Sequence, residues 1–133
     1  MQLITLYLST AVVFLGIDAV FLRLVMRPIF ESHLGDWLLD DFRVTAAAIF
    51  YLFYVAGVLF FVSLPALQGD GTLASTLFKG ALLGLMAYGT YEFTNYAVLD
   101  RWHPSMVAVD VAWGAILTGS SAVIGLAITR VVH

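Results

Sequence analysis

The chain has 133 residues, of which 62% are hydrophobic and 11% are charged, and its formal net charge is -3 at pH 7. A mean hydropathy of +0.97 leaves too little polar surface to cover a soluble globule of this size. The few basic residues exclude a nucleic-acid footprint, and the absence of cysteine excludes disulfides, thiol catalysis and cysteine-ligated metals.

Four apolar runs follow one another along the chain, and each has roughly the 20 residues that a helix needs to cross a bilayer. The predicted spans are residues 3–25, 44–64, 77–99 and 106–128. The first run lacks the basic start and the cleavage site of a signal peptide, so we predict a retained span. The predicted fold is therefore all-α: a single transmembrane domain, residues 1–133, that forms an integral membrane four-helix bundle with antiparallel up-down topology.

Short connections join the predicted spans. In the first, residues 26–43, Pro28 is expected to end the first helix because proline has no amide hydrogen. The second, residues 65–76, contains the turn signal Gly69-Asp70-Gly71. The third, residues 100–105, is so brief that the helices on either side of it must be antiparallel neighbours.

An even number of spans places both termini on one side of the membrane and the first and third connections on the other. Basic residues near the span ends favour the connection side, with Arg23, Arg27, Arg43 and Arg101 there against Lys79 and Arg130 on the terminal side. The positive-inside rule then predicts cytoplasmic connections and termini outside. The acids are more lopsided, since only Asp70 lies in the terminal half; the connection half holds Asp18, Glu31, Asp36, Asp40, Asp41, Glu92, Asp100 and Asp110.

Three carboxylates lie inside the predicted spans: Asp18, Glu92 and Asp110. At a rise of about 1.5 Å per residue, they lie about 12, 10 and 9 Å from the connection ends of their spans, so we expect them in one layer of the bundle. A charge at such depth costs several kcal/mol unless it finds a partner or a water-filled cavity. We therefore predict that protons, a bound cation or an arginine neutralises the carboxyls, and that the first two make the layer a ligand- or proton-binding site.

Basic side chains near the same face are candidate charge partners of these acids: Arg23, Arg43, Arg101 and His103. An arginine that folded inward would turn the acidic layer into a structural knot rather than a binding site. Arg23 follows Asp18 by five residues, a poor spacing for pairing along one helix. His103 is instead a candidate gate for the acidic layer.

The third predicted helix has the strongest local pattern. Tyr88, Glu92 and Asn95 fall on one helical face with Tyr91 beside them. Such a set can hold a cation, a protonated amine or a polar head group, or relay protons, and it can equally supply hydrogen bonds between helices. Trp113, one turn from Asp110, is expected to line the same pocket.

Small residues also recur at helical spacing on the last two predicted helices: Gly80 and Gly84, then Gly114, Thr118, Ser121 and Gly125. We interpret both stripes as faces for close helix packing rather than as ligand contacts. Trp37 and Trp102 are interpreted as anchors at the membrane interface.

Five segments, in this order, are similar to those of a known family: Asp18-Ala-Val-Phe-Leu22, Phe50-Tyr-Leu-Phe-Tyr54, Pro65-Ala-Leu67, Ala87-Tyr-Gly-Thr-Tyr-Glu-Phe-Thr-Asn95 and Val109-Asp-Val-Ala-Trp-Gly114. Over nearly its whole length, the chain resembles the small bacterial membrane proteins catalogued as domain of unknown function 2177. It departs from that pattern at Glu92, where the family usually has Asp, and at Phe21, where it often has Trp. The resemblance implies a four-helix protein of the bacterial inner (cytoplasmic) membrane and implies no activity.

Three classes of function stay open. The first, which we favour, is binding or transport of a small cation, amine or proton at the three acids. Four helices are few for a permeation path, so a transporter is expected to form a homo-oligomer or to join a larger membrane complex. The second is a membrane enzyme acting on a lipid or quinone-like substrate, with the carboxylates as acid and base and Tyr91 or His103 assisting.

The third class is a non-catalytic accessory subunit of a membrane complex, whose buried acids specify only the fold. No cofactor or metal is expected, because the sequence has no HExxH motif, phosphate loop or metal-spaced histidine pair. All three classes place the protein in the lipid bilayer, which is therefore its expected partner.

Overall fold

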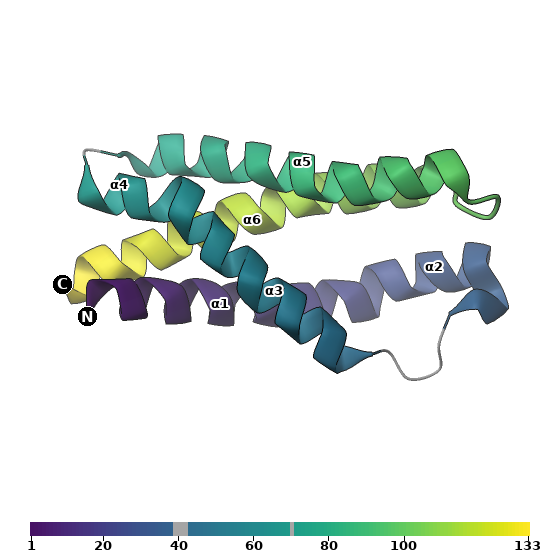
Figure 1. The fold of residues 1–133 in the computed structure, drawn as a ribbon, viewed down its shortest axis with the longest axis horizontal. Coiled ribbons are helices and arrows are strands. Elements are labelled where there is room, and N and C mark those ends of the chain that lie inside the picture. Colours follow the sequence, from purple (N-terminus) through teal and green to yellow (C-terminus); the bar gives the residue numbers. More distant parts are fainter. Residues whose placement is uncertain (39–42, 70) are drawn as a thin grey trace.

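The computed structural model describes residues 1–38, 43–69 and 71–133, and these residues form helices and no strand (Figure 1). In chain order the elements are the helix α1 (Gln2–Phe21), the π-helical turn η1 (Leu22–Met26), α2 (Arg27–Leu34), the 3-10 turn η2 (Gly35–Trp37), α3 (Val44–Val58), the π-helical turn η3 (Leu59–Ser63), α4 (Leu64–Gln68), α5 (Leu73–Val98) and α6 (Pro104–Val132). The all-α prediction is confirmed.

In the described ranges, three continuous helical segments are long and apolar enough to cross a membrane: Gln2–Trp37, Val44–Gln68 and Pro104–Val132. The remaining long helix, α5, has 26 residues, so that it is of comparable length. It is less apolar, because it contains Lys79, Glu92 and Asn95. That α5 is a fourth span stays a prediction.

Pro28 does not end the first helix, so that prediction is wrong. The helix runs from α1 through η1 into α2, with Pro28 in the first turn of α2, and the next helix passes Pro65 in the same way through η3 into α4. A proline clashes with the carbonyl four residues before it and cannot donate to that carbonyl. Here those carbonyls belong to Leu24 and Phe61, and both lie in π-helical turns, whose different hydrogen bonding accommodates the proline.

Helices α5 and α6 form an antiparallel hairpin with the most extensive contact in the structure (Figure 1). Glycines make this approach possible. A Cβ on Gly80 would lie 2.9 Å from the Cα of Gly119, and a Cβ on Gly84 would meet the carbonyl of Gly114. On the other side of α6, a Cβ on Gly125 would meet Thr10 of α1. The interpretation of these glycines as packing positions is confirmed.

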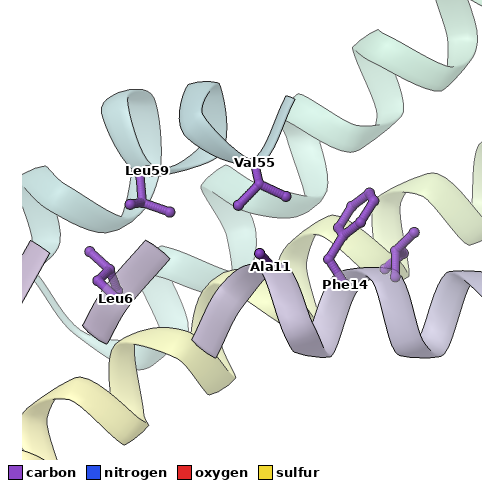
Figure 2. Close-up of a cluster of buried hydrophobic side chains, with 6 residues drawn as sticks. Leu6, Ala11, Phe14, Val55 and Leu59 are labelled. Carbon is purple, nitrogen blue, oxygen red and sulfur yellow. The ribbon is translucent and has the colours of Figure 1, made fainter. Parts of the chain in front are cut away.

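Both chain ends lie at the same end of the bundle (Figure 1), where Thr5 Oγ1 and His133 Nε2 are 3.0 Å apart. Figure 2 shows the buried cluster that fills this half, to which α1 contributes Leu6, Ala11 and Phe14 and the second helix contributes Val55 and Leu59. Within this cluster, Phe14 lies toward the middle of the bundle. Its ring centroid lies 5.7 Å from that of Tyr51 and 5.6 Å from that of Tyr54, so the core orients two tyrosines of α3.

The second helix crosses the others diagonally (Figure 1). Its first part, α3, packs mainly on α1, whereas its close contacts with α5 and α6 come from η3. Helix α3 therefore diverges from the α5–α6 hairpin toward its start at Val44, on the side where α2 and the connection between α5 and α6 lie.

Candidate functional site

A cavity of about 340 Å³ lies where α3 diverges from the hairpin. Among the residues that the structure describes, its only charged lining residues are Asp18 and Asp110, which are 3% and 7% exposed. The walls consist of aliphatic and aromatic side chains from four helical elements, η1, α2, α3 and α5: Leu22, Phe30, Phe50, Tyr51, Tyr54, Ala87, Tyr88 and Tyr91. The result is an acidic pocket inside an aromatic wall.

Asp18 is held by a hydrogen bond from α6 and lies near a tyrosine of α3. The indole Nε1 of Trp113 donates to Asp18 Oδ1 over 3.1 Å, and the hydroxyl of Tyr51 lies within hydrogen-bonding reach of the same carboxyl. The Trp113 ring is itself fixed by stacking on Phe21, with centroids 4.0 Å apart and an angle of 8° between the planes. These contacts orient an acid of α1 relative to α3 and α6.

Glu92 is fully buried behind the cavity wall. Its Oε1 accepts a 2.8 Å hydrogen bond from the indole of Trp102, while Oε2 has no hydrogen-bond donor within the described residues. The carboxyl lies within hydrogen-bonding reach of that of Asp110. Two ionised carboxylates offer only acceptors, so a hydrogen bond between Asp110 and Glu92 would require one shared proton.

The structure thus brings together the three acids that the depth count placed in one layer. Asp18 and Asp110 face the same cavity, and Glu92 adjoins Asp110 from behind. A cation in the cavity would meet two carboxyls directly, and the third could supply or accept the proton that keeps the charge balanced.

The candidate charge partners lie elsewhere. Arg101 donates 2.9 Å hydrogen bonds to Asp36 Oδ1 and to the Leu34 carbonyl, and Arg23 and Arg43 are exposed. No basic side chain in the described ranges forms an ion pair with any of the three buried acids. The alternative in which an arginine neutralises the acids therefore has no support in the structure.

His103 has a local structural role. Its Nδ1 accepts a 3.0 Å hydrogen bond from the backbone N–H of Ser105 and so caps the start of α6. Its ring stacks on His33, with centroids 4.3 Å apart. His103 does not line the cavity, so its expected role as a gate finds no contact to support it.

The residues predicted on α5 divide between the cavity and its surroundings. Tyr88 lines the cavity, and its buried hydroxyl has no partner among the described residues. Tyr91 also lines the cavity, is 53% exposed and meets the Trp102 ring edge-on. Asn95 is within hydrogen-bonding reach of Tyr91 and does not line the cavity.

Trp113 was expected to line the pocket, but its ring lies outside it, in a groove on the α1–α6 face. It reaches the site only through its hydrogen bond to Asp18. Trp102 was interpreted as an interface anchor, which is wrong: it is only 8% exposed and bonds Glu92. The short connection explains this burial. The backbone N–H of Trp102 donates to the Leu99 carbonyl over 3.2 Å, and this turn directs the chain back onto the bundle.

Sequence reasoning missed several wall residues, above all Tyr51, Tyr54 and Phe50 of α3 and Phe30 of α2. The available signal was the segment of residues 50–54, which contributed to the family resemblance but carried no charge to single it out. Asp40, Asp41 and Asp70, which the sequence count of acids included, lie outside the described residues.

Comparison with known proteins gives one family match. The family model described as "Predicted membrane protein (DUF2177)" matches residues 3–127. No curated protein and no solved structure matches the chain.

Proposed function

The chain belongs to this family of predicted membrane proteins, and we propose that it binds a small organic cation, such as a protonated amine, in the cavity between α1, α3, α5 and α6. One observation carries the proposal. Within the described part of the chain, the cavity of about 340 Å³ has two carboxyls as its only charged lining groups and six aromatic rings in its wall.

Each part of this arrangement favours a cation. Aromatic faces attract ammonium groups through their quadrupole, and the attraction grows when the cation is removed from water. Asp18 and Asp110 supply the opposite charge. An anion would face the same two carboxyls with no arginine, lysine or histidine among the lining residues. The volume lies at the small end of the range for small-molecule sites, which fits a compact amine.

Charge balance suggests how binding is coupled to protons. In this proposal one proton is shared between Asp110 and Glu92 in the absence of a ligand, and an arriving cation makes that proton unnecessary. Binding then releases it, so that one positive charge enters as another leaves. The other titratable groups that face this pair are Asp18 from α1, Tyr51 from α3, and Tyr88 and Tyr91 from α5.

Proton release on cation binding is the coupling that a proton-exchanging transporter needs, so transport is the extension of this proposal. A bundle of this size would then need further helices from a second copy or from a larger membrane complex. The inner-membrane location and the outside position of the termini stay predictions of the family resemblance and of the positive-inside rule.

The test is calorimetric titration of the purified protein in phosphatidylcholine nanodiscs. The probes are phenethylammonium, its neutral isostere 2-phenylethanol, and tetraethylammonium, which carries charge without an N–H. Both cations should bind and the alcohol should not. Asp18→Asn and Asp110→Asn should each weaken cation binding by at least about tenfold, which corresponds to about 1.4 kcal/mol.

Asp100→Asn is the matched control, because Asp100 is an exposed acid of the connection next to the same helices. Its affinity for both cations should be unchanged. Equal binding of phenethylammonium and 2-phenylethanol, or full cation affinity in both buried-acid variants, would contradict the proposal. Unchanged thermal unfolding of each variant shows that a loss of binding is not a loss of fold.

A further inference from the structure

Toward the end of the bundle that carries α2 and the α5–α6 connection, apolar side chains of the described residues cover the cavity. A buried apolar cluster, here called the connection plug, fills that end with Leu34, Trp102, Met106 and Val107. Phe30 of α2 packs against Trp102, with ring centroids 5.7 Å apart. Above the plug, Arg101 ties the connection to Asp36 and to the Leu34 carbonyl.

Apolar side chains also cover the cavity toward the end where the termini lie. The core cluster of Figure 2 fills that half, and Phe14 packs against Tyr51 and Tyr54 at the boundary. The Tyr54 hydroxyl is joined to Thr118 Oγ1 over 3.0 Å, which fixes this part of the wall to α6. Neither end of the bundle therefore offers a polar route to the carboxyls through the described residues.

The side of the bundle is different. Two lining residues are more than half exposed, Phe50 at 57% and Tyr91 at 53%, and they stand on α3 and α5, the two helices that diverge. At about 1.5 Å of rise per residue, Phe50 lies about 9 Å from the start of α3 and Tyr91 about 10 Å from the end of α5. The opening is thus at the depth of the hydrocarbon rather than at the membrane surface.

The rim of this opening is apolar. Next to Phe50, the exposed residues of α3 include Ile49 at 66% and Phe53 at 76%, and Phe93 of α5 is 60% exposed. Side chains of this kind at this depth contact lipid chains in a membrane protein. A fully hydrated small ion would have to leave water and cross that layer before it reached Asp18 or Asp110, whereas an amphiphile already resides there.

We propose that the ligand enters sideways from the bilayer between α3 and α5, so that the bound ammonium group belongs to an amphiphile whose alkyl chain stays in the lipid beside Phe50 and Tyr91. The inference rests on the proposed function, because it assumes a cation at the two carboxyls. It adds the class of ligand: a lipid with an amine head group or a free long-chain amine. The ammonium reaches the carboxyls within the aromatic wall, and the chain needs no pocket of its own.

The absence of native cysteine permits a direct test of the route. Phe50→Cys and, as the control, Trp37→Cys each introduce one thiol; Trp37 lies in η2 at the connection end and is half-exposed. Each variant is coupled to a bulky maleimide in nanodiscs, and dodecylammonium binding is compared before and after coupling. Coupling at position 50 should weaken dodecylammonium binding by at least about tenfold, and coupling at position 37 should leave it unchanged.

Chain length gives a second readout, with butylammonium as the short, water-soluble probe. Nanodiscs of phosphatidylcholine alone and nanodiscs that also contain phosphatidylethanolamine distinguish the two sources of the ligand. Weaker dodecylammonium binding in the second kind assigns the site to a lipid head group. Equal binding in both assigns it to a free amphiphilic amine.

The lateral route is overturned if butylammonium binds as tightly as dodecylammonium and coupling at position 37, not at position 50, blocks both. That result would leave the cation site itself intact. Failure of the proposed function looks different: amine binding of any chain length would then be indifferent to Asp18→Asn and Asp110→Asn.

Discussion

The indole of Trp102 and the carboxyl of Glu92 form a 2.8 Å hydrogen bond within the buried part of the structure. The bond ties the connection between α5 and α6 to an acid one and a half turns inside α5. It also satisfies one carboxyl oxygen of Glu92 and leaves the other, Oε2, without a donor. The connection therefore takes part in the acidic site, because it engages one oxygen of Glu92 and leaves the other available on the side of Asp110.

Replacement Trp102→Phe is expected to lower stability. The phenyl ring keeps the packing against Phe30 and Tyr91, but the buried Oε1 of Glu92 loses its donor. An orphaned buried acceptor costs about 1–3 kcal/mol. Chemical denaturation in mixed micelles, followed by circular dichroism, measures the change.

Trp37→Phe is the control for this comparison, since Trp37 is half-exposed and its ring, not its N–H, meets Arg101. Its stability should stay within about 0.5 kcal/mol of the parent protein. If both substitutions have the same effect, the Trp102–Glu92 bond contributes nothing specific.

Cation affinity is expected to rise with pH. The proton between Asp110 and Glu92 competes with the ligand, so the competing form is populated at low pH and removed as pH rises. Release of one proton gives a slope of up to about tenfold in affinity per pH unit. Tetraethylammonium is the suitable probe because it has no titratable group of its own. Titrations in two buffers of different ionisation enthalpy count the protons released.

Glu92→Gln tests the origin of this slope. The amide of Gln can donate to Asp110 and keep the contact without a shared proton, so the dependence of tetraethylammonium affinity on pH should flatten. Asp36→Asn, which removes an exposed acid bound to Arg101, should keep the full slope. A parent protein with no slope, or a Gln variant that retains it, would show that the pair does not exchange its proton with the ligand.

The hairpin of α5 and α6 is expected to be intolerant of a single methyl group at Gly84. A Cβ there would meet the Gly114 carbonyl group and would lie 2.8 Å from Thr118 Oγ1. Backbone atoms cannot move aside singly, so the helices must separate, and overpacking of this kind costs about 1–3 kcal/mol. Gly84→Ala should therefore lower the unfolding temperature measured by circular dichroism in detergent.

Gly57→Ala is the control, and it is expected to change stability in the opposite direction. A Cβ on Gly57 would meet nothing within 4 Å, and alanine in a helix is more stable than glycine by about 0.5–1 kcal/mol. This variant should unfold at the parent temperature or slightly above it. Equal destabilisation by both substitutions would mean that the close approach at Gly84 does not hold the hairpin together.

The sequence was sufficient to predict the depth of the three acids in their helices and the spacing of the packing glycines. The positions of Asp18, Glu92 and Asp110 follow from helical rise and from the ends of the apolar runs, so their meeting could be predicted without coordinates. The packing role of Gly80 and Gly84 likewise follows from helical spacing.

What the sequence could not supply depends on how backbone and side chains turn locally. The sequence pattern predicts a helix end at Pro28 because proline has no amide hydrogen. It does not show that Leu24, whose carbonyl would clash with the proline, lies in a π-helical turn through which the helix continues. The position of Trp102 in a connection predicts an interface residue, because the sequence does not show in which direction the indole points. Tyr51 reaches Asp18 only because α3 crosses α1 at that level.

Tyr88 provides a prediction in which stability and binding change in opposite directions. Tyr88 lines the cavity, and its buried hydroxyl has no partner among the described residues, so Tyr88→Phe removes an unsatisfied group and should leave the empty protein as stable as the parent or up to about 1 kcal/mol more stable. In the bound state, we expect this hydroxyl to accept from the N–H of an ammonium. Loss of such a hydrogen bond weakens phenethylammonium binding by about five- to tenfold, whereas tetraethylammonium, which has no N–H, should bind as before. The control is Tyr96→Phe, on the same helix and 47% exposed, which should change neither affinity. An equal loss for both cations in Tyr88→Phe would contradict the hydrogen bond and would mean that the hydroxyl contributes only to the shape of the wall.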